Sequence, residues 1–124
     1  MKSRRYTELD YMEMCKWWEK RGLPAPSKEY LPKIGYLVED MAAGFLYQTD
    51  GNIGLLDMYI TNSEQEPNQR VDSLRAITTS LLGYAKQIGI KAIKFDTKFD
   101  VIKILATENG FIYTGEHSSY FKEI

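Results

Sequence analysis

Cysteine and histidine are scarce in this chain of 124 residues, which contains one of each, Cys15 and His117. A single cysteine excludes an internal disulfide and a cysteine-only metal cage. One histidine without Cys or Asp at ligand spacing does not make a metal site either. We therefore expect no bound metal and a reducing, cytoplasmic location.

Long hydrophobic runs and an excess of one charge are also missing. No stretch approaches the ~20 apolar residues of a membrane span, and residues 1–5 lead into a polar segment rather than the apolar region of a signal peptide. Sixteen Lys and Arg against seventeen Asp and Glu give a net charge of −1. Because no large basic field exists, we expect neither a nucleic acid nor a membrane as partner.

The residues that are present have the composition of one soluble globular domain, with 44% hydrophobic and 27% charged residues. A chain of this length buries roughly two-thirds of its unfolded surface, which is enough for a core without metal or disulfide support. We therefore expect a single domain over residues 1–124.

The first third of the sequence indicates one helix followed by an irregular segment. Apolar residues at i, i+3, i+4 and i+7 predict an amphipathic helix that ends near Gly22, namely Tyr11, Met14, Cys15 and Trp18. Adjacent helical residues point about 100° apart, so we expect Trp17 or Trp18 to lie at the rim of the core. With the prolines of residues 23–33 and Tyr30, that rim would form an aromatic surface for a protein partner, and packing of the proline-rich loop over the helix explains the pattern equally well.

The middle of the sequence indicates strands. Residues 34–38, 42–49 and 52–60 are short extended runs separated by turn residues, including the pair Asp50 and Gly51. They predict a three-stranded antiparallel meander. Residues 61–69 have no apolar member and include Pro67, so we expect a polar surface loop there.

The remaining residues alternate between helix and strand. A 3.6-residue period predicts a helix that starts near Asp72 or Ser73 and stops at Gly89, with the apolar positions Leu74, Ile77, Leu81, Ala85 and Ile88. Residues 90–96 predict a strand, and its place after that helix suggests parallel pairing with residues 52–60. A second helix over residues 99–108 and strands over 111–113 and 119–124 complete the prediction.

This element order and two local motifs resemble the GNAT superfamily of acetyl-CoA-dependent N-acetyltransferases. Residues 81–93 match the family's LL-x-x-A-x-x-x-G-x-x-x-I stretch, and Gly110-Phe111 resembles the Gly-Phe that opens its penultimate strand. The resemblance implies an α/β, GNAT-like fold, also called the acyl-CoA N-acyltransferase fold, with a mixed, mostly antiparallel sheet flanked by helices. The compact form of residues 35–39 (GYLVE) and 42–47 (AAGFLY), together with the absence of the family's loop glycines, also resembles GNAT-like proteins of tailed phages. This resemblance implies a location in the host cytoplasm or the virion.

The resemblance implies acetyl-CoA as cofactor, held by a Q/R-x-x-G-x-G/A loop whose backbone N–H groups bind the pyrophosphate. The matching residues are Gln69 to Leu74, and both glycine positions differ, because Asp72 and Leu74 stand there. If acyl-CoA binds, the contacts would come from Met58 and Ile60 on the strand and from Gln69, Arg70, Ser73 and Leu74.

The same resemblance places a general-acid tyrosine five residues before Phe111, where this chain has Ala106. Asp57 and Tyr59 are two positions apart on the central strand, so we expect their side chains to share one face. They are the candidate catalytic residues for proton transfer. Asp57 could equally form structural hydrogen bonds.

Three hypotheses follow. In the first, the chain is a degenerate GNAT-like protein that has lost conventional acetyl-CoA chemistry and binds a protein partner, such as a virion or host protein. In the second, it is an active N-acyltransferase with an atypical pyrophosphate loop. In the third, the C-terminal strands join two copies into a homodimer.

Overall fold

The computed structural model describes residues 1–124 and contains one five-stranded sheet in the order β1-β2-β3-β4-β5. The strands are β1 (Arg4–Arg5), β2 (Gly35–Val38), β3 (Ala42–Gln48), β4 (Ile53–Thr61) and β5 (Ala92–Phe95). Neighbours pair antiparallel from β1 to β4, and β4 pairs parallel with β5. The predicted meander and parallel pairing are confirmed, whereas β1 was not predicted.

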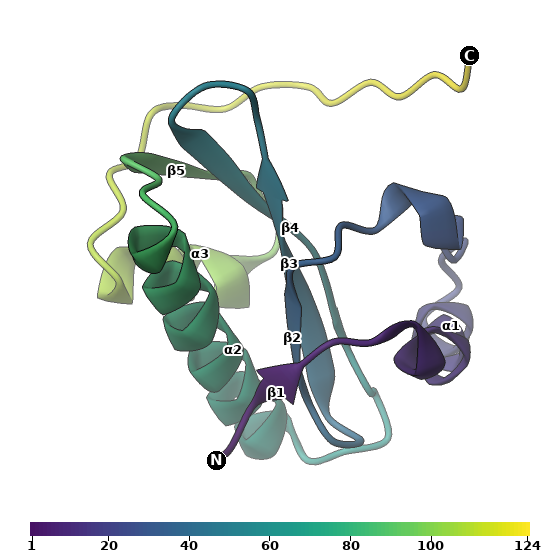
Figure 1. Ribbon diagram of the computed structural model, residues 1–124. Helices are drawn as coiled ribbons and strands as arrows, with labels where there is room; N and C mark the ends of the chain where they lie inside the picture. The colour runs from purple at the N-terminus through teal and green to yellow at the C-terminus, as the bar shows by residue number, and fades with distance from the viewer.

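Helices cover both faces of the sheet (Figure 1). On one side lies α1 (Tyr11–Lys20), and on the other lie α2 (Pro67–Gln87) and α3 (Asp100–Glu108). Two short 3-10 helices, η1 (Glu8–Asp10) and η2 (Lys28–Tyr30), flank α1 in the sequence. None of these helices combines the length and hydropathy that a membrane crossing requires.

The sheet separates two hydrophobic cores. The α2-side core has eleven buried residues from β2, β3, β4, α2 and α3 and the segment before β2, including Leu46, Leu56 and Ile77. The α1-side core has eight, including Trp17 and Phe45. Alternation along each strand supplies both cores, because successive side chains point to opposite faces.

Both tryptophans belong to the α1-side core, so the expectation that one lies at the rim is wrong. Trp17 is 1% exposed and Trp18 is 5% exposed. The sheet packs against one side of α1, and the proline-rich segment covers another, since Ala25 and Leu31 pack on the same core and the Tyr11 hydroxyl donates to the Pro26 carbonyl at 2.6 Å. An aromatic docking surface therefore does not exist at this position.

The start of α2 also differs from the prediction. The helix begins at Pro67, not near Asp72 or Ser73, and its N-cap residue is Glu66. Proline fits the first helical position because its fixed φ suits a helix and its missing N–H is an unpaired group there anyway. The loop after β4 is correspondingly shorter than expected.

No strand forms after α3, so the predicted strands at 111–113 and 119–124 are absent from the structure. The segment of residues 112–124, here called the C-terminal segment, crosses the end of the sheet and finishes on the side of α1 (Figure 1). Its apolar positions have no sheet neighbour to pack against, and β5 remains at the edge of the sheet.

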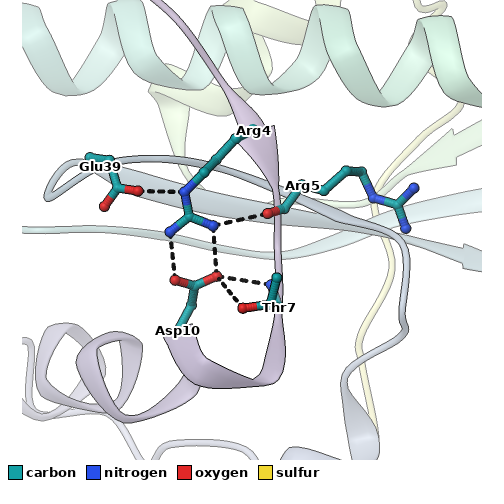
Figure 2. A network of polar contacts seen from close by, with 5 residues as sticks. All are labelled: Arg4, Arg5, Thr7, Asp10 and Glu39. Atoms are coloured by element: carbon teal, nitrogen blue, oxygen red, sulfur yellow. Dashed lines mark hydrogen bonds and ion pairs between the residues drawn. The ribbon is translucent and has the colours of Figure 1, made fainter.

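Arg4 joins β1, η1 and the β2–β3 hairpin in one polar network (Figure 2). Its guanidinium donates to both carboxylate oxygens of Asp10, at 2.6 and 3.0 Å, and also to Glu39 and to the Arg5 carbonyl. Asp10 in turn accepts the backbone N–H of Thr7 at 2.8 Å. The network fixes the chain entering α1 against the edge of the sheet.

We expect Asp10→Asn to lower the free energy of unfolding by about 1–3 kcal/mol at pH 7, because it removes a charged, bidentate hydrogen-bonded pair. The hydrogen bond from Arg4 holds the pKa of Asp10 below its ordinary value of 3.8. A depressed carboxylate pKa stabilises the folded state above the unfolded pKa, and this contribution is lost as the pH falls through the folded pKa. Urea unfolding of both proteins from pH 7 to pH 2.5 should therefore show the difference shrinking below about pH 4.

Asp72→Asn is the matched control, because Asp72 forms an exposed pair with Arg75 one turn away. Such pairs contribute about 0.5 kcal/mol or less. An Asp10→Asn difference that stays constant from pH 7 to pH 2.5 would contradict the charge-based account.

Candidate functional site

The candidate site lies where β4 continues beyond the end of β5. The parallel pairing runs from Ile53 opposite Ala92 to Leu56 opposite Phe95, and β4 then continues to Thr61 without that neighbour. The strand edge from residue 57 to residue 61 therefore has no strand neighbour on the β5 side. An extended ligand could pair with this edge as an additional strand.

A β-bulge lies at the start of this edge. Along β3 and β4, Phe45 pairs with Asp57, whereas Ala43 pairs with Ile60, so β4 has one residue more than β3 over this interval. Met58 adopts the left-handed conformation with φ of 57°, which is uncommon for a residue other than glycine.

The bulge places Asp57 and Tyr59 on opposite faces of the sheet, so the prediction that they share a face is wrong. Asp57 pairs with Phe45, a residue of the α1-side core. Tyr59 packs against the α2-side core instead. The strict alternation assumed from the sequence fails because the extra residue reverses the direction of every later side chain.

Tyr59 is half-buried and packs against the α2-side core. Its hydroxyl hydrogen bonds with Thr78 Oγ1 at 2.8 Å, and its ring lies 5.2 Å from that of Phe95. Burial raises the pKa of Tyr59 well above its ordinary value of 10. The phenol therefore stays protonated at neutral pH and contacts α2 rather than the open strand edge.

Asp57 is exposed, and its Oδ1 accepts the backbone N–H of Met58 at 2.7 Å. This bond stabilises the bulge and also occupies a backbone donor at the open edge. Burial, together with the nearby charge of Asp57, raises the pKa of Tyr47 to about 12. Of the two catalytic candidates from the sequence, Asp57 is exposed and Tyr59 is half-buried.

The cofactor-binding candidates on α2 are separated by the helix. Ser73 and Leu74 are buried, with the Ser73 hydroxyl donating to the Arg70 carbonyl at 2.6 Å and Leu74 in the core. Gln69 is exposed in the first turn. Arg70 donates to the Ser63 and Gln65 carbonyls at 3.0 and 2.8 Å and so holds the preceding loop.

Sequence reasoning missed Arg21, which follows α1 and reaches the end of β4. Its guanidinium donates to the Thr61 carbonyl at 3.1 Å and to the Thr61 hydroxyl. Burial and the charge of Arg70 lower the pKa of Arg21. No local motif marks Arg21, because the contact joins residues 40 positions apart.

Other polar groups on α2 are structural. Arg75 donates to both carboxylate oxygens of Glu108 at 3.0 Å and to Asp72 at 3.0 Å, which ties α2 to α3. Asp72 therefore lies within the helix and is not its N-cap. No group of three or more His, Cys, Asp or Glu side chains is arranged to hold a metal ion.

Comparison with solved structures assigns the architecture. A mutant form of TTHA1254 from Thermus thermophilus aligns over 99% of this chain and 98% of its own, with a TM-score of 0.74 and 15% identity. A probable acetyltransferase aligns over 100% and 98%, with a TM-score of 0.72 and 16% identity. Glucosamine-6-phosphate N-acetyltransferase from Arabidopsis thaliana aligns over 98% of each chain, with a TM-score of 0.67 and 10% identity.

The chain has the GNAT fold. No protein-family model matches the sequence, and a search of curated proteins gives no significant match. The expected GNAT-like α/β architecture is confirmed, although the two final strands of the prediction are not formed. At these identities the likeness shows the fold alone, and function has to be argued from the site.

Gly44 on β3 lies beside the Tyr59 ring of β4. A Cβ at Gly44 would lie 2.8 Å from that ring, which is held by packing against the α2-side core and by the Thr78 hydrogen bond. We expect Gly44→Ala to lower the free energy of unfolding by about 1–3 kcal/mol through overpacking. Gly83→Ala is the control, because its Cβ would meet nothing within 4 Å inside α2, and it should stabilise by about 0.5–1 kcal/mol. Equal Tm changes for both variants would contradict this packing.

Proposed function

We propose that this chain is a GNAT-fold binding protein that does not perform conventional acetyl-CoA-dependent transfer. The observation that carries the proposal is the uninterrupted helix α2, which begins at Pro67 and includes the whole segment from Gln69 to Leu74. A pyrophosphate cradle needs several free backbone N–H groups and a close approach of the ligand to the backbone. Inside a helix these groups are bonded to one another, and side chains surround them.

The first turn of α2 is a poor replacement for that cradle. Pro67 has no N–H, and the N–H of Arg70 already donates to the Glu66 carbonyl at 3.0 Å. Only the backbone N–H groups of Asn68 and Gln69 remain in this turn to bind a phosphate. Glu66 is the N-cap residue of this turn, whereas Glu64 is paired with Lys20 at 2.8 Å. A phosphate within about 4 Å of the Glu66 carboxylate would be repelled by ~1–4 kcal/mol at effective dielectric constants of 80 to 20.

The groups needed for transfer chemistry are also missing or engaged. The Tyr59 hydroxyl is hydrogen-bonded to Thr78 on α2, the N–H of Met58 is bonded to Asp57, and residue 106 is alanine. Each lost general acid or base typically reduces a rate by ~10²–10⁴. Together these features favour binding over catalysis.

A protein is the kind of partner that the exposed apolar residues support. The outward side of α3 presents Val101 and Ile104, which are 38% and 59% exposed, and Phe99 before the helix is 56% exposed. Neighbouring exposed apolar groups of this kind are typical of protein-binding surfaces. If the gene belongs to a tailed phage, as the sequence resemblance implies, the partner would be a virion or host protein.

An active N-acyltransferase is the second candidate function, and the open edge of β4 favours it. Residues 57–61 extend beyond β5, which leaves backbone groups of Met58 and Ile60 for an extended pantetheine arm. In that case Arg70 and Arg21 would contact the phosphates, and Asp57 would accept the proton of the amine.

Thermal unfolding with and without millimolar acetyl-CoA separates the two functions. A ligand at 100 times its Kd stabilises by ~2.7 kcal/mol, which raises Tm by several degrees at this size. We expect no change in Tm beyond the change that ADP, a charged control, produces. A rise specific to acetyl-CoA that is lost in Arg70→Ala would instead support the acyltransferase.

A further inference from the structure

The outer edge of β5 has no strand neighbour. β5 is the last strand of the sheet and pairs on one side only, with β4 (Figure 1). No backbone hydrogen bond joins residues 92–95 to the residues that follow α3. An open strand edge presents unpaired N–H and C=O groups, which form a template for an additional strand.

An apolar groove lies beside this edge. It has a volume of about 650 Å³, which is in the range of ligand-binding pockets in proteins. Its apolar lining comes from the end of α2, from β5 and from the residues after α3, including Leu82, Ala85, Ile90, Ile93 and Phe111. All of these except Ala85 are only half-buried, so the groove leaves part of the α2-side core uncovered.

The alternation of side chains along β5 defines what an added strand must carry. Ile93 and Phe95 pack against the α2-side core, whereas Ala92 and Lys94 are exposed on the opposite face. A strand paired with this edge follows the same alternation, so every second side chain lies over the groove and the others lie beside Ala92 and Lys94. The first set must be apolar to fill the groove, and the second set meets a lysine.

Positive charge surrounds the groove and the edge. Residues 86–98 contain four lysines, Lys86, Lys91, Lys94 and Lys98, and Asp96 is the single acidic residue among them. All four lysines are exposed, and none forms an ion pair. Two identical edges of this kind repel each other, whereas a strand that carries carboxylates is attracted. Charge therefore favours an acidic strand from a different protein over a second copy of β5.

The chain's own C-terminal segment leaves the edge and the groove open. Ile112 at the rim of the groove is 86% exposed, and Tyr113 is 77% exposed. Farther along, the Tyr30 hydroxyl donates to Glu123 at 2.6 Å, and the rings of Tyr30 and Phe121 lie 6.0 Å apart. These contacts hold the end of the segment against η2, on the side of the sheet opposite α2 (Figure 1).

We propose that the edge of β5 and the groove beside it bind an extended acidic segment of a partner protein, in which apolar residues alternate with Asp or Glu. Backbone hydrogen bonds to β5 supply affinity, and the groove and the lysines select the side chains. Because β5 has four residues, the contact belongs to the small, reversible interfaces that bury less than about 1,200 Å². The inference rests on the proposed function as a binding protein and names the surface and the chemistry of the partner.

A fluorescein-labelled peptide amide, Glu-Val-Glu-Ile-Glu-Val-Glu, tests the proposal by fluorescence anisotropy with the full-length chain. We expect saturable binding. Three control peptides change one property each: lysine replaces every glutamate, the order Glu-Glu-Val-Ile-Val-Glu-Glu removes the alternation, or proline replaces the central isoleucine. Each control should bind at least tenfold more weakly, because it repels the lysines, turns apolar side chains away from the groove or cannot complete the strand pairing.

Charge reversal on the protein tests the lysines. The double variant Lys91→Glu, Lys94→Glu should weaken binding of the acidic peptide at least tenfold and strengthen binding of the lysine peptide, because attractions and repulsions change places. The matched control is Lys2→Glu, Lys16→Glu, which makes the same change in net charge at exposed lysines before β1 and on α1. It should alter either affinity less than twofold. Far-UV circular dichroism checks that each variant is folded.

Amide hydrogen exchange locates the contact. The acidic peptide should slow exchange at least tenfold at the outward-facing N–H groups of residues 92–95. Residues 57–61 of β4, the other strand edge without a neighbour, should exchange at the same rate with and without the peptide.

No binding, equal binding of all four peptides, or protection outside β5 would overturn the proposal. A dimer in sedimentation that covers β5 and excludes the peptide would overturn it as well. The acetyl-CoA measurement separates this failure from failure of the proposed function. Without an acetyl-CoA-specific rise in Tm, lack of peptide binding removes this surface alone, whereas peptide binding together with such a rise removes the proposed function instead.

Discussion

One extra residue in β4 decides how both faces of the sheet are used. Because Met58 takes the left-handed conformation, the part of β4 after the bulge is reversed relative to the part before it. Leu56 packs in the α2-side core and Ile60 in the α1-side core, although they are four positions apart and would share a face in a regular strand. The left-handed backbone costs roughly 1–2 kcal/mol, which the Asp57 hydrogen bond and the packing of both cores offset.

Local patterns in the sequence predicted most elements of this fold. The turn residues of the meander, the apolar period from Leu74 to Ala85 and the strand after Gly89 each act within a few residues, so their effects can be read directly. Pro67 was misinterpreted because proline marks both a loop and the first turn of a helix, and the local pattern does not separate these. The burial of both tryptophans depends on residues 23–33 folding over α1, which is a contact between separate segments.

The candidate site was less predictable than the fold because it also depends on contacts between separate segments. Strand alternation placed Asp57 and Tyr59 together, and no sequence signal revealed a bulge at a methionine. Arg21 reaches Thr61 from a different element, and Arg70 turns back to the loop before its own helix. The chain has the GNAT fold, whereas Arg21 and Arg70 hold loops and Tyr59 packs against a core.

Both tryptophans lie on the same side of the sheet, so tryptophan fluorescence is confined to that side. The chain has two tryptophans, Trp17 and Trp18, and both lie in the α1-side core. Tryptophan fluorescence therefore reports on that half alone, because the α2-side core contains tyrosine and phenylalanine but no tryptophan. Since α2 and α3 supply most of the helical residues, circular dichroism reports chiefly on the other half. Two routine spectroscopic signals thus follow opposite sides of one sheet without any added label.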